Sequence, residues 1–156
     1  MAQKTTLSIS LPAAAADVWR VVSEQGPLLG SRFLGWPCEK GLGAERRCRD
    51  RNGLPVLERV IGWDEGWSYR VTLVQHSLPV AWAEGGVQLE REHADSTRVT
   101  FTVDYMPKYG ALGRLLDAAF LRSRLERQLS ALIARLAAEL GVGGPEVPAA
   151  MPLAAG

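Results

Sequence analysis

The most unusual chemistry in this sequence is a pair of opposite charges inside an apolar stretch, LPVLERVIGW, at positions 54–63. Successive side chains of a strand point to opposite faces, so Glu58 and Arg59 lie on different sides of it. Each face is otherwise largely apolar, and alternation alone leaves open which charge points inward. A buried charge needs a partner, so the inward one marks either a ligand site or a structural ion pair.

Two tyrosines and a histidine are the other side chains with useful acid–base groups. Tyr69 and Tyr105 alternate in phase with apolar neighbours, so their hydroxyls point inward, either to a ligand or to a backbone partner. His76 stands at a strand end, where it could act as an acid or base, whereas His93 lies in a polar turn, EREHADS. The candidates for a catalytic role are therefore Glu58, Tyr69, Tyr105 and His76, and none of them is assigned.

Motifs that identify common enzyme classes do not occur in the sequence. There is no G-x-S-x-G, no H-E-x-x-H and no phosphate-binding loop. Cys38 and Cys48 form no C-x-x-C pair and lie far from both histidines, so the sequence predicts neither a metal site nor a cofactor. A net charge of +1 gives no basic footprint for nucleic acid.

Length and hydropathy indicate one globular domain. The 156 residues are 47% hydrophobic and 22% charged, which are ordinary proportions for a soluble protein. No stretch reaches the ~18 consecutive apolar residues of a membrane span, and the polar residues within 5–11 argue against a signal peptide. We expect a cytoplasmic protein with reduced thiols, and the sequence leaves its oligomeric state open.

An antiparallel sheet must position most of these side chains. Residues 5–11 alternate as a strand, and 13–24 follow as a helix, with a second short helical piece over 28–34. Short apolar segments then alternate with turn residues, and Asn52-Gly53 is the clearest hairpin signal. Including the first, about seven strands are expected, the others being 34–39, 43–51, 55–64, 67–75, 84–92 and 97–105.

A single helix over 111–140 is expected to close the domain. At 1.5 Å per residue it would be ~45 Å long, and its apolar stripe rotates partway, so the surface that it contacts changes. Gly141 is a suitable C-cap, and the Pro/Gly/Ala-rich residues 141–156 are expected to be a disordered tail. The prediction is one α+β domain over residues 1–140.

The order of these elements resembles the polyketide cyclase/dehydrase branch of the START and birch-pollen-allergen superfamily. The resemblance covers residues 5–140 and implies the helix-grip fold, a curved antiparallel sheet around a long C-terminal helix with a hydrophobic cavity between them. It rests on PAAAADVWRVVSE after the first strand, GLGAERR in the third, LERVIGWDEGWSYRV in the fourth and fifth, and TRVTFTVDYMPKYGALGRLLD running into the helix.

The resemblance also implies which side chains face that cavity. In related plant hormone receptors a GLP turn precedes a strand whose ER pair puts the glutamate in the ligand pocket, and 53–55 and 58–59 are similar here, with a shorter spacer. Glu58 is therefore expected inside, with Arg46 and Arg122 as its alternative partners. The expected ligand-binding residues are Glu58, Val56, Val60, Tyr69, Val71, Phe101, Val103, Tyr105, Ala119, Arg122 and Arg46.

Three functions stay open at this point. The leading hypothesis is a binding module that holds a small hydrophobic or amphipathic molecule, lipid- or polyketide-like, in the cavity. The second is a polyketide cyclase, aromatase or dehydratase using cavity acid–base groups. The third is a cochaperone-like or assembly protein that binds a partner through an outer surface or the helix, which an exposed patch of Trp63 and Leu57 on the convex face would support.

Overall fold

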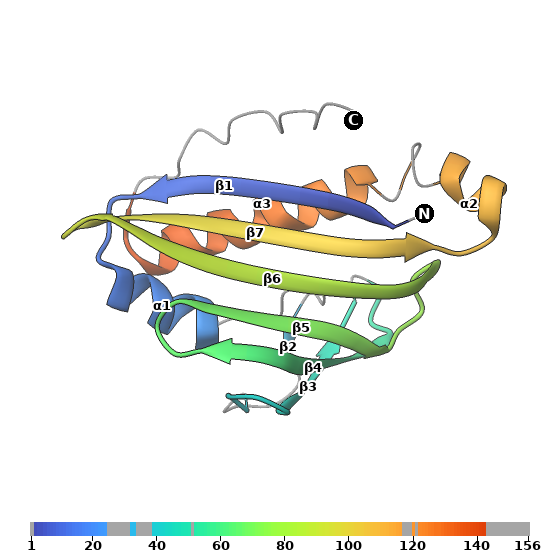
Figure 1. The fold of residues 1–156 in the computed structure, drawn as a ribbon, viewed down its shortest axis with the longest axis horizontal. Coiled ribbons are helices and arrows are strands. Elements are labelled where there is room, and N and C mark those ends of the chain that lie inside the picture. Colours follow the sequence, from blue (N-terminus) through green and yellow to red (C-terminus); the bar gives the residue numbers. More distant parts are fainter. Residues whose placement is uncertain are drawn as a thin grey trace.

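One antiparallel sheet organises the computed structural model, which describes residues 2–24, 32–33, 39–50, 52–116, 120 and 122–142. The strands are β1 Gln3–Leu11, β2 Arg32–Phe33, β3 Glu45–Arg49, β4 Pro55–Asp64, β5 Ser68–Gln75, β6 Val80–His93 and β7 Ser96–Pro107. The helices are α1 Ala15–Glu24, α2 Gly110–Leu116 and α3 Arg122–Glu139. Within the described residues the sheet has seven strands in the order β1-β7-β6-β5-β4-β3-β2 (Figure 1), so the first strand pairs with the last.

The sheet has one buried face because its strands alternate in side-chain type. In β1, Leu7 and Ile9 are buried while Ser8 between them is exposed. The register pairs Leu7 with Phe101 of β7, and Phe101 with Val87 of β6, so apolar residues of neighbouring strands form continuous layers. The inward orientation predicted for the alternate residues of the last strand is confirmed.

A tight turn fixes the register of β3 against β4. The Asp50 carboxylate oxygen Oδ1 accepts hydrogen bonds from the backbone N–H groups of Asn52 and Leu54, at 2.8 and 2.9 Å. Gly53 takes a φ of +79°, which favours glycine. The hairpin predicted at Asn52-Gly53 is confirmed, and it places Arg46 of β3 opposite Glu58 of β4.

Two helices pack on the buried face and complete the core. α1 buries Val18, Trp19, Val21 and Val22 and lies against β6 and β7. α3 lies against β1 and α1 and buries a stripe at helical spacing that includes Leu129 and Ile133. At its end the predicted cap is confirmed, since Gly141 has a φ of +67° and its N–H bonds to the Ala138 carbonyl at 3.1 Å.

The single helix expected over 111–140 is wrong. The chain forms α2 and α3 as separate helices, and Figure 1 shows α2 at one end of the molecule, beyond the end of β7. The rotation of the apolar stripe noted in the sequence reflects two helices with different surroundings, because α3 buries its apolar stripe whereas Leu112 of α2 is exposed.

Smaller differences concern the edges of the predicted elements. Residues 34–38 of the strand expected over 34–39 lie outside the described residues, Glu39 is not in a strand, and β2 is the short pair Arg32–Phe33. β6 begins at Val80 rather than at 84. Of the expected tail, residues 143–156 also lie outside the described residues. No described helix has the length and apolar character needed to cross a bilayer.

Candidate functional site

A buried ion pair lies at the centre of the candidate site. Arg46 Nη2 donates to Glu58 Oε2 at 3.0 Å, and the two side chains are 1% and 0% exposed. The two residues face each other across β3 and β4. The inward orientation of Glu58 is therefore confirmed, and of the two alternative partners it is Arg46 that contacts it.

Arg122 is not in this site, so its placement in the interior is wrong. It begins α3, its side chain is 48% exposed, and its Nε lies 3.3 Å from Glu126 Oε1, one helical turn on. The prediction extended a helical wheel through 111–140, whereas α3 has its own stripe. Ala119, the helix residue expected beside it, lies outside the described residues.

Tyr69 of β5 covers the ion pair. The Arg46 guanidinium carbon lies 5.1 Å from the centre of the Tyr69 ring, within the range of a cation–π contact. The Tyr69 hydroxyl donates to the backbone carbonyl of Val22 in α1 at 3.1 Å. Of the two roles left open for this hydroxyl, the backbone partner is the one observed, and it fastens α1 to the sheet beside the charges.

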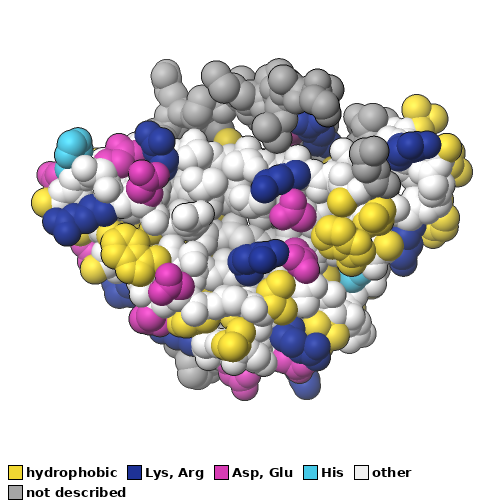
Figure 2. All heavy atoms as spheres, in the orientation of Figure 1, with side chains coloured by type: hydrophobic (Ala, Val, Ile, Leu, Met, Phe, Trp, Pro, Cys, Tyr) yellow, Lys and Arg dark blue, Asp and Glu magenta, His cyan; other side chains and the backbone are white. Residues whose placement is uncertain are grey.

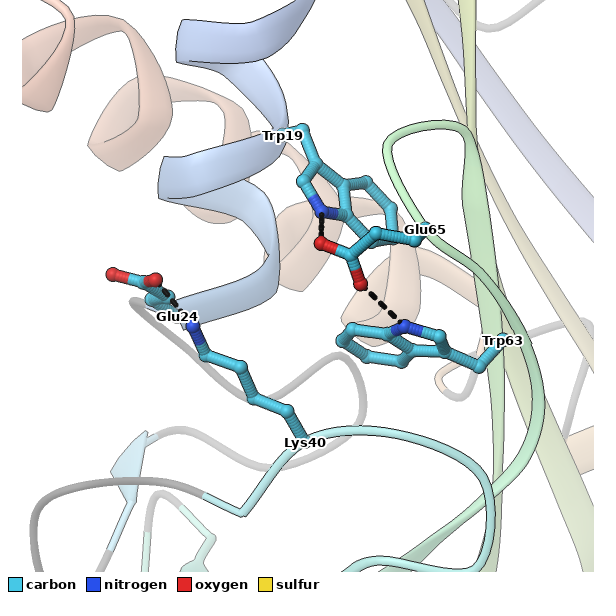
Figure 3. Close-up of polar contacts among 5 residues, drawn as sticks. All are labelled: Trp19, Glu24, Lys40, Trp63 and Glu65. Atoms are coloured by element: carbon cyan, nitrogen blue, oxygen red, sulfur yellow. Dashed lines mark hydrogen bonds and ion pairs between the residues drawn. The ribbon is translucent and has the colours of Figure 1, made fainter.

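Two tryptophans extend Tyr69 into an aromatic cluster. Trp19 of α1 and Trp63 of β4 have ring centres 5.2 Å apart in an edge-to-face arrangement, and Tyr69 lies 6.0 Å from the first and 5.6 Å from the second. Figure 3 shows both indoles turned toward one carboxylate, that of Glu65. Trp19 Nε1 donates to it at 2.9 Å and Trp63 Nε1 at 2.7 Å.

These hydrogen bonds set the charge state of Glu65. They hold the pKa of the Glu65 carboxyl below its usual value, with the Trp19 bond contributing most, the Trp63 bond next and the charge of Lys40 a smaller part. Lys40 itself forms an ion pair with Glu24 at the end of α1 (Figure 3). An anionic carboxylate therefore clamps the two indoles on one side of the cluster.

The sequence analysis missed Trp19 and misplaced Trp63. Trp19 lies in helical phase with the buried Val22, a signal that was present in the sequence. Trp63 was expected on the convex face, but the β4–β5 register shifts between Val60 and Gly62 and sets Trp63 opposite the buried Tyr69. The exposed Trp63–Leu57 patch that would support a partner-binding protein is not formed, since both side chains are partly buried.

The remaining inner-face residues are buried as expected, and whether they contact a ligand stays a prediction. They are Val56, Val60, Val71, Phe101, Val103 and Tyr105. His76 follows β5 and is half-buried. Burial lowers its pKa, and the charge of Lys108 lowers it further, so the imidazole is neutral at pH 7. No described cluster of His, Cys, Asp or Glu is suited to hold a metal ion.

Comparison with known proteins identifies the family of this chain. One family model matches residues 2–141, and it is described as polyketide cyclase / dehydrase and lipid transport. The chain belongs to this family. A search of the curated proteins found no match.

Solved structures show the same fold as this member of the polyketide cyclase/dehydrase family. Norcoclaurine synthase from Thalictrum flavum, in complex with dopamine and hydroxybenzaldehyde, has a TM-score of 0.63 at 18% identity, covering 89% of this chain and 88% of that one. A protein from Thermobifida fusca has a TM-score of 0.61 at 19% identity, covering 87% and 94%. Ara h 8.0201 has a TM-score of 0.56 at 11% identity, covering 90% and 99%. The chain thus has the helix-grip fold of the START and birch-pollen-allergen superfamily.

Proposed function

We propose that this chain binds a small hydrophobic or amphipathic molecule, lipid- or polyketide-like, between the inner face of the sheet and the helices. Most of that face is apolar, and the buried charges on it are Arg46 and Glu58, which contact Tyr69 through the Arg46 guanidinium. An apolar interior with a few converging polar groups is the usual form of a small-molecule site. The ligand's polar end would lie against this group. We also propose that the protein is located in the cytoplasm.

The buried ion pair is the observation that carries the proposal. Two charges at 1% and 0% exposure lose their hydration, and well-packed apolar residues at the same positions would often give equal or greater stability. The folding of a helix-grip sheet gives no reason to keep a guanidinium and a carboxylate at adjacent positions of its inner face. Recognition of a polar group on an otherwise apolar ligand does give such a reason.

A cyclase-type reaction is less well supported by the same contacts. An acid–base mechanism needs a group that is available to exchange a proton with the substrate. The Tyr69 hydroxyl already donates to the Val22 carbonyl, and the Glu58 carboxylate already accepts from Arg46. Both groups are thus in positions that suit binding and orientation better than proton transfer.

The test is a titration of the full-length protein with the fluorophore 8-anilinonaphthalene-1-sulfonate, an apolar molecule with one anionic group. We expect saturable binding that Val71→Phe weakens by about tenfold, because the larger ring fills the interior. The matched control is Val74→Phe on the same strand, where the side chain is exposed and the substitution should leave affinity unchanged. Equal affinities of the two variants for the fluorophore would show that it does not bind in the interior.

A second variant tests the polar end and does not depend on the folding of Val71→Phe. Glu58→Gln keeps the shape and removes the charge, so we expect about a tenfold change in affinity for the same fluorophore. Loss of thermal stability with unchanged affinity would make Glu58 a structural residue only. Native mass spectrometry of the purified protein should in addition detect a co-purifying apolar molecule.

A further inference from the structure

Exposed apolar side chains gather at the end of the molecule where α2 lies. Tyr109, Leu112 and Leu115 are 70%, 61% and 67% exposed. Trp82 is 37% exposed and lies opposite Met106 of β7. Met106 precedes Tyr109 by three residues. Figure 2 shows hydrophobic side chains on this end, whereas charged side chains are scattered over the sheet's outer face.

α2 is turned the opposite way from a helix that packs on a core. Of the α2 residues whose burial is described, Gly113 is the buried one, and an added Cβ there would lie 1.6 Å from the Lys108 carbonyl oxygen and 3.6 Å from the Pro107 side chain. Leu112 and Leu115, three residues apart on one stripe, face away from it. A helix normally buries its large apolar side chains, so this orientation presents them for contact with something else.

The backbone that leads into α2 holds this orientation. Tyr109 has a φ of +70°, a conformation that a non-glycine residue adopts at a cost. The Tyr109 carbonyl accepts from the Gly113 N–H at 3.1 Å, and the Lys108 N–H donates to the Pro79 carbonyl at 3.1 Å. The aromatic ring is thus kept outward by a strained turn that is tied to the β5–β6 connection.

Positive charges are interleaved with these apolar side chains. Lys108 precedes Tyr109, Arg114 lies between the two exposed leucines, and the side chains of Lys108 and Arg114 are themselves exposed. The nearby Asp50 carboxylate is engaged in its own turn and by the Ser77 hydroxyl at 3.3 Å. In sequence the segment 106–125 carries four basic residues and one acidic residue, Asp117.

We infer that this end of the molecule, defined by Trp82, Tyr109, Leu112 and Leu115 with Lys108 and Arg114, docks onto an anionic lipid bilayer. Exposed leucines can enter the boundary between headgroups and acyl chains, and aromatic rings favour that depth. Lysine and arginine beside them attract anionic headgroups. A bilayer also accepts a scattered arrangement of apolar and cationic groups, whereas a protein partner would need a matched set of carboxylates. The inference does not rest on interior binding, since the docking surface shares no residue with the interior site.

The test is co-sedimentation of the full-length protein with sucrose-loaded vesicles. One set is phosphatidylcholine, and the other contains about one-third phosphatidylglycerol. We expect binding to the anionic vesicles that weakens as NaCl rises from about 50 to about 500 mM. Leu112→Ser with Leu115→Ser should reduce the partition coefficient at least about tenfold, because two apolar side chains are lost from the contact. Lys108→Gln with Arg114→Gln should reduce binding to the level seen with phosphatidylcholine alone.

Leu42→Ser is the matched control. Leu42 is 73% exposed in the turn before β3. This turn lies at the other end of the β3–β4 hairpin from Asn52-Gly53, so the Leu42 substitution should leave sedimentation unchanged. The inference is overturned if the wild-type protein stays in the supernatant with both vesicles, or if the leucine double variant sediments like the wild type. A concentration-dependent dimer that this double variant abolishes would also overturn it, since a second copy would then cover the surface.

Discussion

At the scale of single residues, the paired Arg46 and Glu58 dominate the energetics of the interior. Each charge is stabilised by the other at 3.0 Å, so the pair behaves as one unit in both stability and binding. Alternation in LPVLERVIGW could not decide between Glu58 and Arg59. The hairpin register could not decide it either, because it places Arg46 opposite Glu58 and Glu45 opposite Arg59, so both faces carry an Arg–Glu pair.

Removing one member of this pair should cost far more than removing both. We expect Arg46→Met to lower the free energy of unfolding by about 3–5 kcal/mol, because the buried Glu58 would lose the guanidinium with which it pairs. Arg46→Met with Glu58→Leu should recover most of that loss. Urea unfolding followed by circular dichroism measures both. A single-variant cost below about 1 kcal/mol, the range of surface pairs, would contradict the burial of the pair.

The carboxylate of Glu65 should make stability depend on pH in a predictable direction. Its pKa is lower in the folded protein than the ordinary value of 4.5, so its contribution is complete above pH 4.5 and is lost as the pH falls through the lowered folded-state pKa. The difference in unfolding free energy between the wild type and Glu65→Gln should therefore be constant near neutrality and shrink below pH 4.5. Urea unfolding followed by tryptophan fluorescence measures it. Glu90→Gln, an exposed carboxyl on β6, controls for the loss of charge alone, and a difference that grows in acid would refute the clamp.

At the scale of elements, the sequence predicts an alternating strand well and a break in its phase poorly. The inward and outward faces of β5 and β7 follow directly from alternation. In β4 the register shift near Gly62 turns Trp63 to the other face, because one extra residue inverts everything after it. The helical pattern likewise changes phase between α2 and α3, and the prediction treated the two helices as one. In β4 a glycine, Gly62, lies where the pattern changes.

Gly113 is the residue on which the position of α2 depends. A Cβ there would come within 1.6 Å of the Lys108 carbonyl oxygen, so the backbone would have to move. We expect Gly113→Ala to displace α2 and to lower the free energy of unfolding by about 1–3 kcal/mol. Thermal unfolding and limited proteolysis over residues 107–116 would report it.

Gly86→Ala is the comparison for that variant. The Cβ of this β6 residue would meet its nearest neighbour at 3.5 Å, an ordinary contact, so its effect should stay below about 1 kcal/mol. Equal effects of the two substitutions would mean that α2 is not held by close approach at Gly113.

At the scale of the whole molecule, the sheet should not open uniformly. β7 pairs with β1 over 97–105 and with β6 along nearly its whole length, whereas within the described residues β3 has the two-residue β2 on one side. We expect amide hydrogens of β7 to exchange through global unfolding and those of β3 to exchange through local opening, at least about tenfold faster. Native-state hydrogen exchange measures this directly, and equal protection of the two strands would show that the sheet opens as one unit.

The overall architecture was predictable because turn residues separate the elements and each element keeps one period. A strand, a helix, a run of antiparallel strands and a closing helical region follow from the sequence in that order. The contacts around Trp19 were harder to predict from the sequence. Trp19 and Tyr69 come from α1 and β5, and Glu65 comes from the turn between β4 and β5. Their meeting depends on where α1 lies over the sheet, which no local pattern encodes.

The pairing of β1 with β7 has a consequence for synthesis on the ribosome. Leu7 finds its partner, Phe101, only after nearly the entire sheet has been translated. Until then β1 is an alternating strand with unsatisfied backbone groups on both edges and an apolar side, the kind of segment that pairs with other chains. A nascent chain of this protein therefore remains open to chaperone capture or misassociation for most of its elongation, and closure of the sheet is a late event.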